Sequence, residues 1–85
     1  MKQFKVIGIM IYDRIKESGR TQKTLTKYGH CIKSRLGFHE VNEDVCSRVG
    51  MVILQLGGQM SEWEKLEEEL NQIGGVQVKN MTFEN

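Results

Sequence analysis

The sequence predicts a small α+β sandwich whose strands and helices follow one another in the order βαββαβ. Residues 4–12 and 49–56 alternate as strands do and carry apolar side chains on both faces. Residues 61–73 show the three- and four-residue apolar spacing of a helix. A chain of 85 residues can bury roughly 60–65% of its unfolded surface, enough for one core. We therefore expect a single domain spanning residues 1–85.

The first helix has the weaker signal, and two starting points stay open. Asp13 is suited to be its N-cap, but Gly19 interrupts the pattern at a cost of about 1 kcal/mol relative to alanine. The helix therefore starts either after Asp13 or near Gly19. Gly29 is expected to end it as the C′ residue, and a strand over residues 31–38 follows.

The second helix is marked more plainly. Ser61 and Glu64 have the spacing of a capping box, which predicts the helix start at Ser61. Gly74-Gly75 is expected to stop the helix before a last strand over residues 76–83. The predicted buried stripe comprises Trp63, Leu66, Leu70 and Ile73. The three glutamates 67–69 are predicted to form the solvated face.

The two middle strands predict self-association. Two helices can cover only one face of a four-stranded sheet, whereas both strands are apolar on both faces. A second copy of the same sheet would cover the other face most economically. We therefore expect a homo-dimer or homo-tetramer that assembles through the sheet.

Charge is divided unevenly along the chain. Residues 1–40 hold nine Lys/Arg and three acids, about +6, and residues 41–85 hold three Lys/Arg and eight acids, about −5, which together give the net +1. The basic half predicts a surface for an anionic partner or for a second copy, or simply a solvated helix face.

With two cysteines and no apolar run long enough to span a membrane, we expect a cytoplasmic protein without disulfides.

Several short segments, taken in order, carry a resemblance to a known family. They are Val6-Ile7-Gly8-Ile9, Asp13-Arg14, Arg35-Leu36-Gly37-Phe38 and Gly75-Val76-Gln77-Val78-Lys79. In this set the chain resembles the short iron-only hydrogenase system regulators, which share an ACT-like fold with the C-terminal domain of nickel-responsive repressors. The chain departs from the family in a longer segment over residues 38–48. The resemblance implies a ferredoxin-like βαββαβ sandwich, a four-stranded antiparallel sheet with two helices on one face.

The resemblance also implies a function. ACT-like domains place effectors near the loop after the first strand, which corresponds here to Tyr12, Asp13 and Arg14, with Gly37 nearby. Arg14 could bind a carboxylate in a bidentate way. We expect a non-enzymatic regulatory or small-ligand-sensing homo-oligomer without a cofactor. Because the chain begins directly at its first strand, we expect a transcription-related regulator that lacks its own DNA-binding domain.

The alternative is a metal-responsive regulator that binds a transition metal through His39 and Cys46, which could meet across a hairpin. Catalysis has little support, because the sequence has no phosphate-binding glycine loop and no recognisable nucleophile with its partners. A basic stripe could contact phosphates but carries no base-reading motif, so we expect no sequence-specific nucleic-acid binding. The stripe comprises Lys16, Arg20, Lys23 and Lys27.

Overall fold

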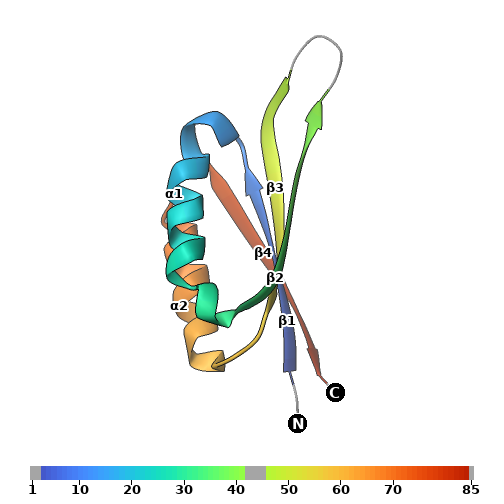
Figure 1. Ribbon diagram of the computed structural model, residues 1–85, viewed down its shortest axis with the longest axis vertical. Coiled ribbons are helices and arrows are strands. Elements are labelled where there is room, and N and C mark those ends of the chain that lie inside the picture. The colour runs from blue at the N-terminus through green and yellow to red at the C-terminus, as the bar shows by residue number, and fades with distance from the viewer. Residues whose placement is uncertain (1–2, 42–45, 85) are drawn as a thin grey trace.

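The computed structural model of the chain describes residues 3–41 and 46–84. Its elements are β1 (Gln3–Ile11), α1 (Arg14–Lys27), a 3-10 turn η1 (Gly29–Cys31), β2 (Ile32–Val41), β3 (Cys46–Leu56), α2 (Met60–Asn71) and β4 (Val76–Glu84). The strands form one antiparallel sheet in the order β2-β3-β1-β4. Both helices lie on one face of this sheet, as seen edge-on in Figure 1. The predicted ferredoxin-like α+β fold is confirmed.

The register decides which side chains of the central strands face the helices. Ile7 pairs with Leu54 and Ile9 with Val52 across β1 and β3, and these side chains are buried. The core between sheet and helices also contains side chains from α1 and α2. These are Leu25, Tyr28, Trp63, Leu66 and Leu70, together with Ile73 just after α2. The predicted stripe of the second helix is therefore the core stripe.

Helix α1 begins at Arg14, so the predicted later start near Gly19 is wrong. The Asp13 carboxylate accepts a hydrogen bond from the Lys16 amide at 3.2 Å, which satisfies one amide of the first turn. Gly29 does follow the C-cap Tyr28, but it does not have the positive φ of a left-handed C′ residue. The chain instead continues into η1, so Cys31 ends that turn and is buried, and β2 starts one residue later than expected.

Helix α2 begins at Met60, with Gln59 as its N-cap, so the predicted capping box at Ser61 is wrong. A local side-chain contact accompanies the earlier start. Gly58 takes φ +70°, and the Trp63 indole N–H donates to the Gly57 carbonyl at 2.8 Å, which holds the turn against the first turn of the helix. Helix α2 ends at Asn71, with Gln72 as its C-cap, so it stops before the predicted Gly74-Gly75. Gly75, with φ +77°, lies in the turn that leads into β4.

The predicted solvated glutamate face is wrong at two of its three positions. Glu67 is half-buried and binds Lys5 at 3.0 Å and the Asn80 amide at 2.5 Å, which ties α2 to β1 and β4. Glu69 binds Lys27 at 2.7 Å and ties α2 to α1. The basic and acidic halves of the chain therefore partly neutralise each other within the fold.

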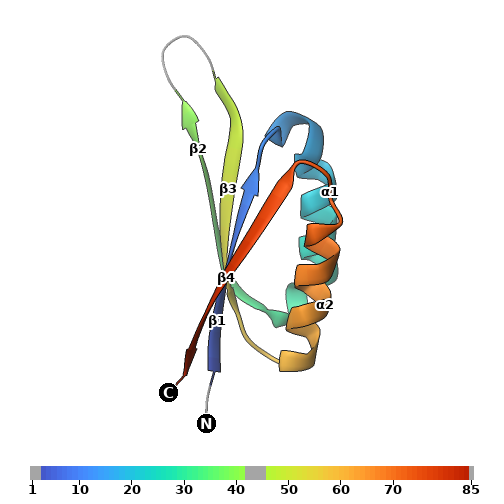
Figure 2. The ribbon, with the colours of Figure 1, turned by 180° about the vertical axis from the view of Figure 1, so that it is seen from behind.

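The ends of the described chain lie at the same end of the sheet, as Figure 2 shows from behind. The far ends of β2 and β3 extend past the helix layer. None of the helices in the described part of the chain is long and apolar enough to cross a membrane.

Candidate ligand-binding site

The loop between β1 and α1 holds two of the predicted ligand residues side by side. The Tyr12 amide donates to the Gly75 carbonyl at 2.9 Å, which joins this loop to the turn before β4. The Tyr12 hydroxyl donates to Gln77 Oε1 at 2.7 Å, and its ring is half exposed. Asp13 caps α1. The loop therefore presents an anchored phenol beside a helix N-terminus.

A buried carboxylate lies beneath the same loop. Glu17 is one turn into α1, and its Cγ lies 3.6 Å from where a Cβ on Gly75 would stand. Its Oε2 is buried without a hydrogen-bond partner in the described part of the chain, although Arg20 Nη1 lies 3.5 Å away. Sequence reasoning missed this residue, because a first-turn glutamate ordinarily faces solvent. The only sequence signal is its place one turn after the Asp13 cap.

The other two predicted ligand residues have different outcomes. Arg14 is the first residue of α1, but its side chain lies outside those that the structure describes. Gly37 lies on β2 and pairs with Val52 of β3. Because β3 lies between β2 and β1, Gly37 is two strands away from the strand that leads to Tyr12. The structure therefore brings together Tyr12 and Asp13 but not Gly37.

The metal alternative gains no support from the strand register. The side chains of His39 and Cys46 lie outside the described ones, but their backbones are placed: His39 pairs with Gly50, and Cys46 pairs with Val41. Gly50 and Cys46 are four residues apart on β3, roughly 13 Å. Among the described residues, no group of three or more His, Cys, Asp or Glu is arranged to hold a metal ion.

Cys31 is a core thiol. Its side chain is buried and its Sγ donates to the Tyr28 carbonyl at 3.3 Å. Burial raises the pKa of the thiol, and the nearby Glu62 carboxylate raises it further. The thiolate that metal binding or nucleophilic chemistry requires is therefore disfavoured here.

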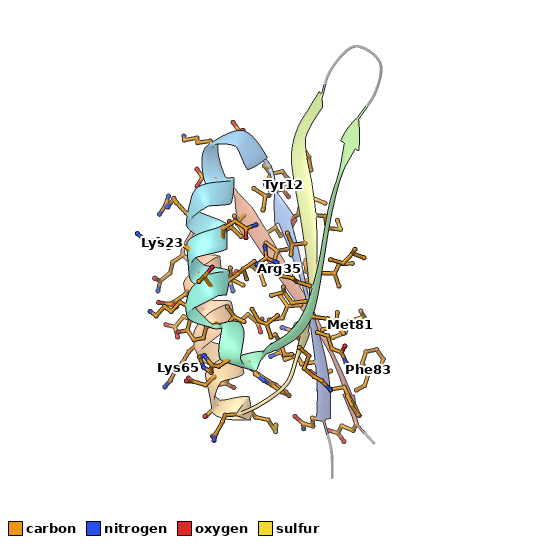
Figure 3. All side chains as sticks on the ribbon, in the orientation of Figure 1. Tyr12, Lys23, Arg35, Lys65, Met81 and Phe83 are labelled. Atoms are coloured by element: carbon orange, nitrogen blue, oxygen red, sulfur yellow. The ribbon has the colours of Figure 1, made fainter. Side chains whose placement is uncertain are left out.

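The basic stripe on α1 is exposed, as predicted, and Figure 3 shows Lys23 pointing away from the sheet. Two of its four members are already engaged. Arg20 lies beside Glu17, and Lys27 binds Glu69. Fewer cations than the sequence suggested are therefore available to a nucleic acid.

The sheet face opposite the helices is not covered by any element of the described chain, and we call it the open face. Fourteen strand residues with described side chains lie on this face, and nine of them have large apolar side chains. The open face comprises Phe4, Val6, Gly8, Met10, Ser34, Leu36, Val49, Met51, Ile53, Gln55, Gln77, Lys79, Met81 and Phe83. Met81 and Phe83 point away from the helices in Figure 3 and are 57% and 53% exposed.

The comparisons with known proteins place the fold. The sequence matches no protein-family model and no curated protein. Among solved structures, the chain is similar to the uncharacterized protein TM1266 from Thermotoga maritima, with 25% identity, a TM-score of 0.80 and coverage of 98% of this chain and 100% of that one.

The chain also shares its fold with CPII, a nitrogen regulatory PII-like protein from Thiomonas intermedia K12. One CPII structure has a TM-score of 0.61 at 13% identity over 99% of this chain and 93% of that one. A second has a TM-score of 0.58 at 15% identity, covering 99% and 96%. These similarities support a ferredoxin-like fold that PII-like regulatory proteins also use. The resemblance to hydrogenase system regulators stays a prediction.

Proposed function

We propose that this protein is a non-enzymatic, small-ligand-sensing regulatory module that acts as a homo-oligomer assembled through its open face. The observation that carries the proposal is the apolar character of that face in a chain whose two helices cover only the other one. The fold that the chain shares with CPII supports the regulatory class, because CPII is a nitrogen regulatory protein.

The size of the open face fits a second copy of the chain. Four strands about 4.8 Å apart and seven residues of about 3.4 Å each give a flat area of roughly 450 Å² per copy. Two facing copies would bury about 900 Å², not counting the extra surface of protruding side chains. This is close to the ~1,000 Å² of a specific interface. At about 25 cal/mol per Å², covering 400 Å² of apolar surface would favour association by an amount on the order of 10 kcal/mol before the entropic cost of association is subtracted.

The effector site of this module is the β1–α1 loop with Tyr12, Asp13 and Arg14. The helix N-terminus and the Arg14 guanidinium offer donors for an anionic ligand, and the Tyr12 hydroxyl, whose proton goes to Gln77 Oε1, can accept a hydrogen bond from such a ligand. The bond from the Tyr12 amide to the Gly75 carbonyl couples this loop to β4, an edge strand of the open face. Ligand binding at the loop would therefore influence assembly through β4.

The resemblance to iron-only hydrogenase system regulators suggests the process that the module serves. In this proposal it acts in the cytoplasm as a regulator related to transcription. The genes beside its own test this part, since hydrogenase-maturation neighbours would support the proposed process and unrelated neighbours would oppose it.

A binding experiment tests the module. We would titrate the chain with ADP, AMP and bicarbonate, the molecules bound in the CPII structure, and follow melting temperature and sedimentation together. A ligand at 100 times its Kd raises the stability of the folded state by about 2.7 kcal/mol. Tyr12→Phe should weaken binding, and Asp13→Asn, which keeps an N-cap but removes a negative charge beside the anion, should strengthen it. Ser34→Ala, on the far edge strand, should change nothing.

Binding that neither Tyr12→Phe nor Asp13→Asn affects would place the effector elsewhere. A chain that sediments as a folded monomer at high micromolar concentration would refute the assembly.

A further inference from the structure

The centre of the open face is hollow because one residue there has no side chain. Gly8 lies in the middle of β1, and a Cβ built on it meets no atom within 4 Å. A hollow of about 230 Å³ lies over this point. Its lining is largely apolar and comprises Val6, Gly8, Met51, Ile53, Lys79, Asn80 and Met81.

One charged residue stands at this hollow. The row across the sheet runs Leu36, Ile53, Gly8, Lys79, so the lysine lies directly beside the glycine on the edge strand. Lys79 is the only charged residue among the fourteen that define the open face, and it has no ion-pair partner in the described part of the chain. Apolar walls with one cation at the rim suit a ligand that has an apolar body and a negative end.

Assembly strengthens this preference. If a second copy covers the open face, the Lys79 ammonium loses water, and burying an unpaired charge is costly. No carboxylate of the fourteen open-face residues can pair with it, in either copy. A small anion carried into the interface would supply the missing charge, and two facing hollows would offer about twice the volume of one, within the ~300–1,000 Å³ of small-molecule sites.

We propose that the hollow over Gly8 binds a small amphipathic carboxylate, with its apolar part against Val6, Met51 and Ile53 and its carboxylate paired with Lys79, and that a second copy closes the site. This proposal rests on the proposed assembly through the open face, and it adds a second ligand site at the centre of the sheet, separate from the β1–α1 loop.

The test uses three probes with the same eight-carbon tail: octanoate, octanol and octylammonium. The full-length chain is titrated with each while amide NMR signals and sedimentation are followed. Octanoate should bind best and shift the signals of Gly8, Ile53 and Lys79. Lys79→Gln should weaken octanoate at least tenfold with little effect on octanol, and Lys79→Arg should restore octanoate binding.

Gly8→Val tests the hollow itself. Its side chain has room and suits a strand, so the variant should stay folded while octanoate binding is lost. Ser34→Val, on the same face but outside the hollow, should leave binding unchanged.

The outcomes separate this site from the assembly. Three results would overturn the site and leave the assembly standing, if the chain is assembled. They are equal binding of octanoate and octylammonium, octanoate binding that Lys79→Gln does not weaken, and no binding of either probe. A folded monomer that binds octanoate through Lys79 and Gly8 supports the site and contradicts the closing copy.

Discussion

Lys27 at the end of α1 binds Glu69 in the last turns of α2, with 2.7 Å between Nζ and Oε1. The contact joins the basic half of the sequence to the acidic half. The hydrogen bond from Lys27 lowers the pKa of the Glu69 carboxyl, and the same bond raises the pKa of the Lys27 ammonium. The charge division that suggested an external partner is thus partly used to hold the two helices together.

Replacing Glu69 should make the free energy of unfolding fall less steeply as the pH is lowered. Because the folded carboxyl has a lowered pKa, its contribution is complete above the ordinary value of about 4.3 and is lost as the pH falls through the lowered value. Lys27, whose pKa is raised, loses its contribution only above about pH 10.4. Urea unfolding between pH 3 and pH 8 should therefore show a smaller loss below about pH 5 in Glu69→Gln than in wild type.

The matched control for that experiment is Glu68→Gln, an exposed neighbour on the same helix. An unchanged acid slope in Glu69→Gln, or an equal change in Glu68→Gln, would contradict the role of the Lys27 contact.

Removing the indole N–H of Trp63 should loosen the start of α2. Trp63→Phe keeps an aromatic ring in the core but leaves the Gly57 carbonyl without its donor. Gly57 is only half-buried, so losing this hydrogen bond should lower the free energy of unfolding by about 0.5–1.5 kcal/mol. The control is Met60→Leu, an exposed change in the first turn, which should hardly alter the free energy of unfolding. If Trp63→Phe were as stable as wild type, the indole bond would not stabilise the turn.

The two glycines after α2 should respond differently to alanine. Gly75 has φ +77°, which costs an L-residue roughly 1–2 kcal/mol. Gly74 does not have a positive φ, and a Cβ there meets no atom within 4 Å. Thermal unfolding should therefore show a lower melting temperature for Gly75→Ala and little change for Gly74→Ala. The reverse order would contradict the described turn.

Binding to DNA should be weak and should not depend on sequence. The exposed lysines of α1 can neutralise phosphates, but nothing in the described chain reads bases. Retention of a labelled duplex should fall steeply between about 50 and 200 mM salt. Nanomolar, sequence-selective binding at physiological salt would overturn the prediction.

A charge on β3 should unfold the protein or separate its copies, depending on which of two adjacent residues carries it. Val52 is 8% exposed and faces the helices, whereas Ile53 is 37% exposed and faces outward. An aspartate at position 52 would bury an unpaired carboxylate, so Val52→Asp should lose its folded circular dichroism spectrum. Ile53→Asp should remain folded.

The alternation of apolar residues predicted the strands, the sheet and the two central strands that are apolar on both faces. This was possible because a two-residue period can be read from neighbouring residues alone. It could not tell which row faces the helices; that is decided by packing, and the structure places Ile9 and Val52 inward. The start of α2 was missed because the spacing of Ser61 and Glu64 does not show whether the capping bonds form; the helix starts one residue earlier, with Gln59 as its N-cap.

The candidate sites were predictable in part. Tyr12 and Asp13 are adjacent in the sequence, so their proximity needed no fold. The Gly8–Lys79 pair could not be predicted, since the two residues are 71 positions apart and meet only through the register of β1 with β4. Glu17 was missed because its side chain lies close to Gly75, which comes from the other end of the chain, and the sequence does not show that approach.

Sedimentation velocity of wild type beside Ile53→Asp tests the central claim most directly. Assembly through the open face predicts that wild type sediments as a dimer or tetramer at micromolar concentration and that folded Ile53→Asp sediments as a monomer. Wild type that sediments as a folded monomer at high micromolar concentration, or an Ile53→Asp variant that assembles as wild type does, would contradict it.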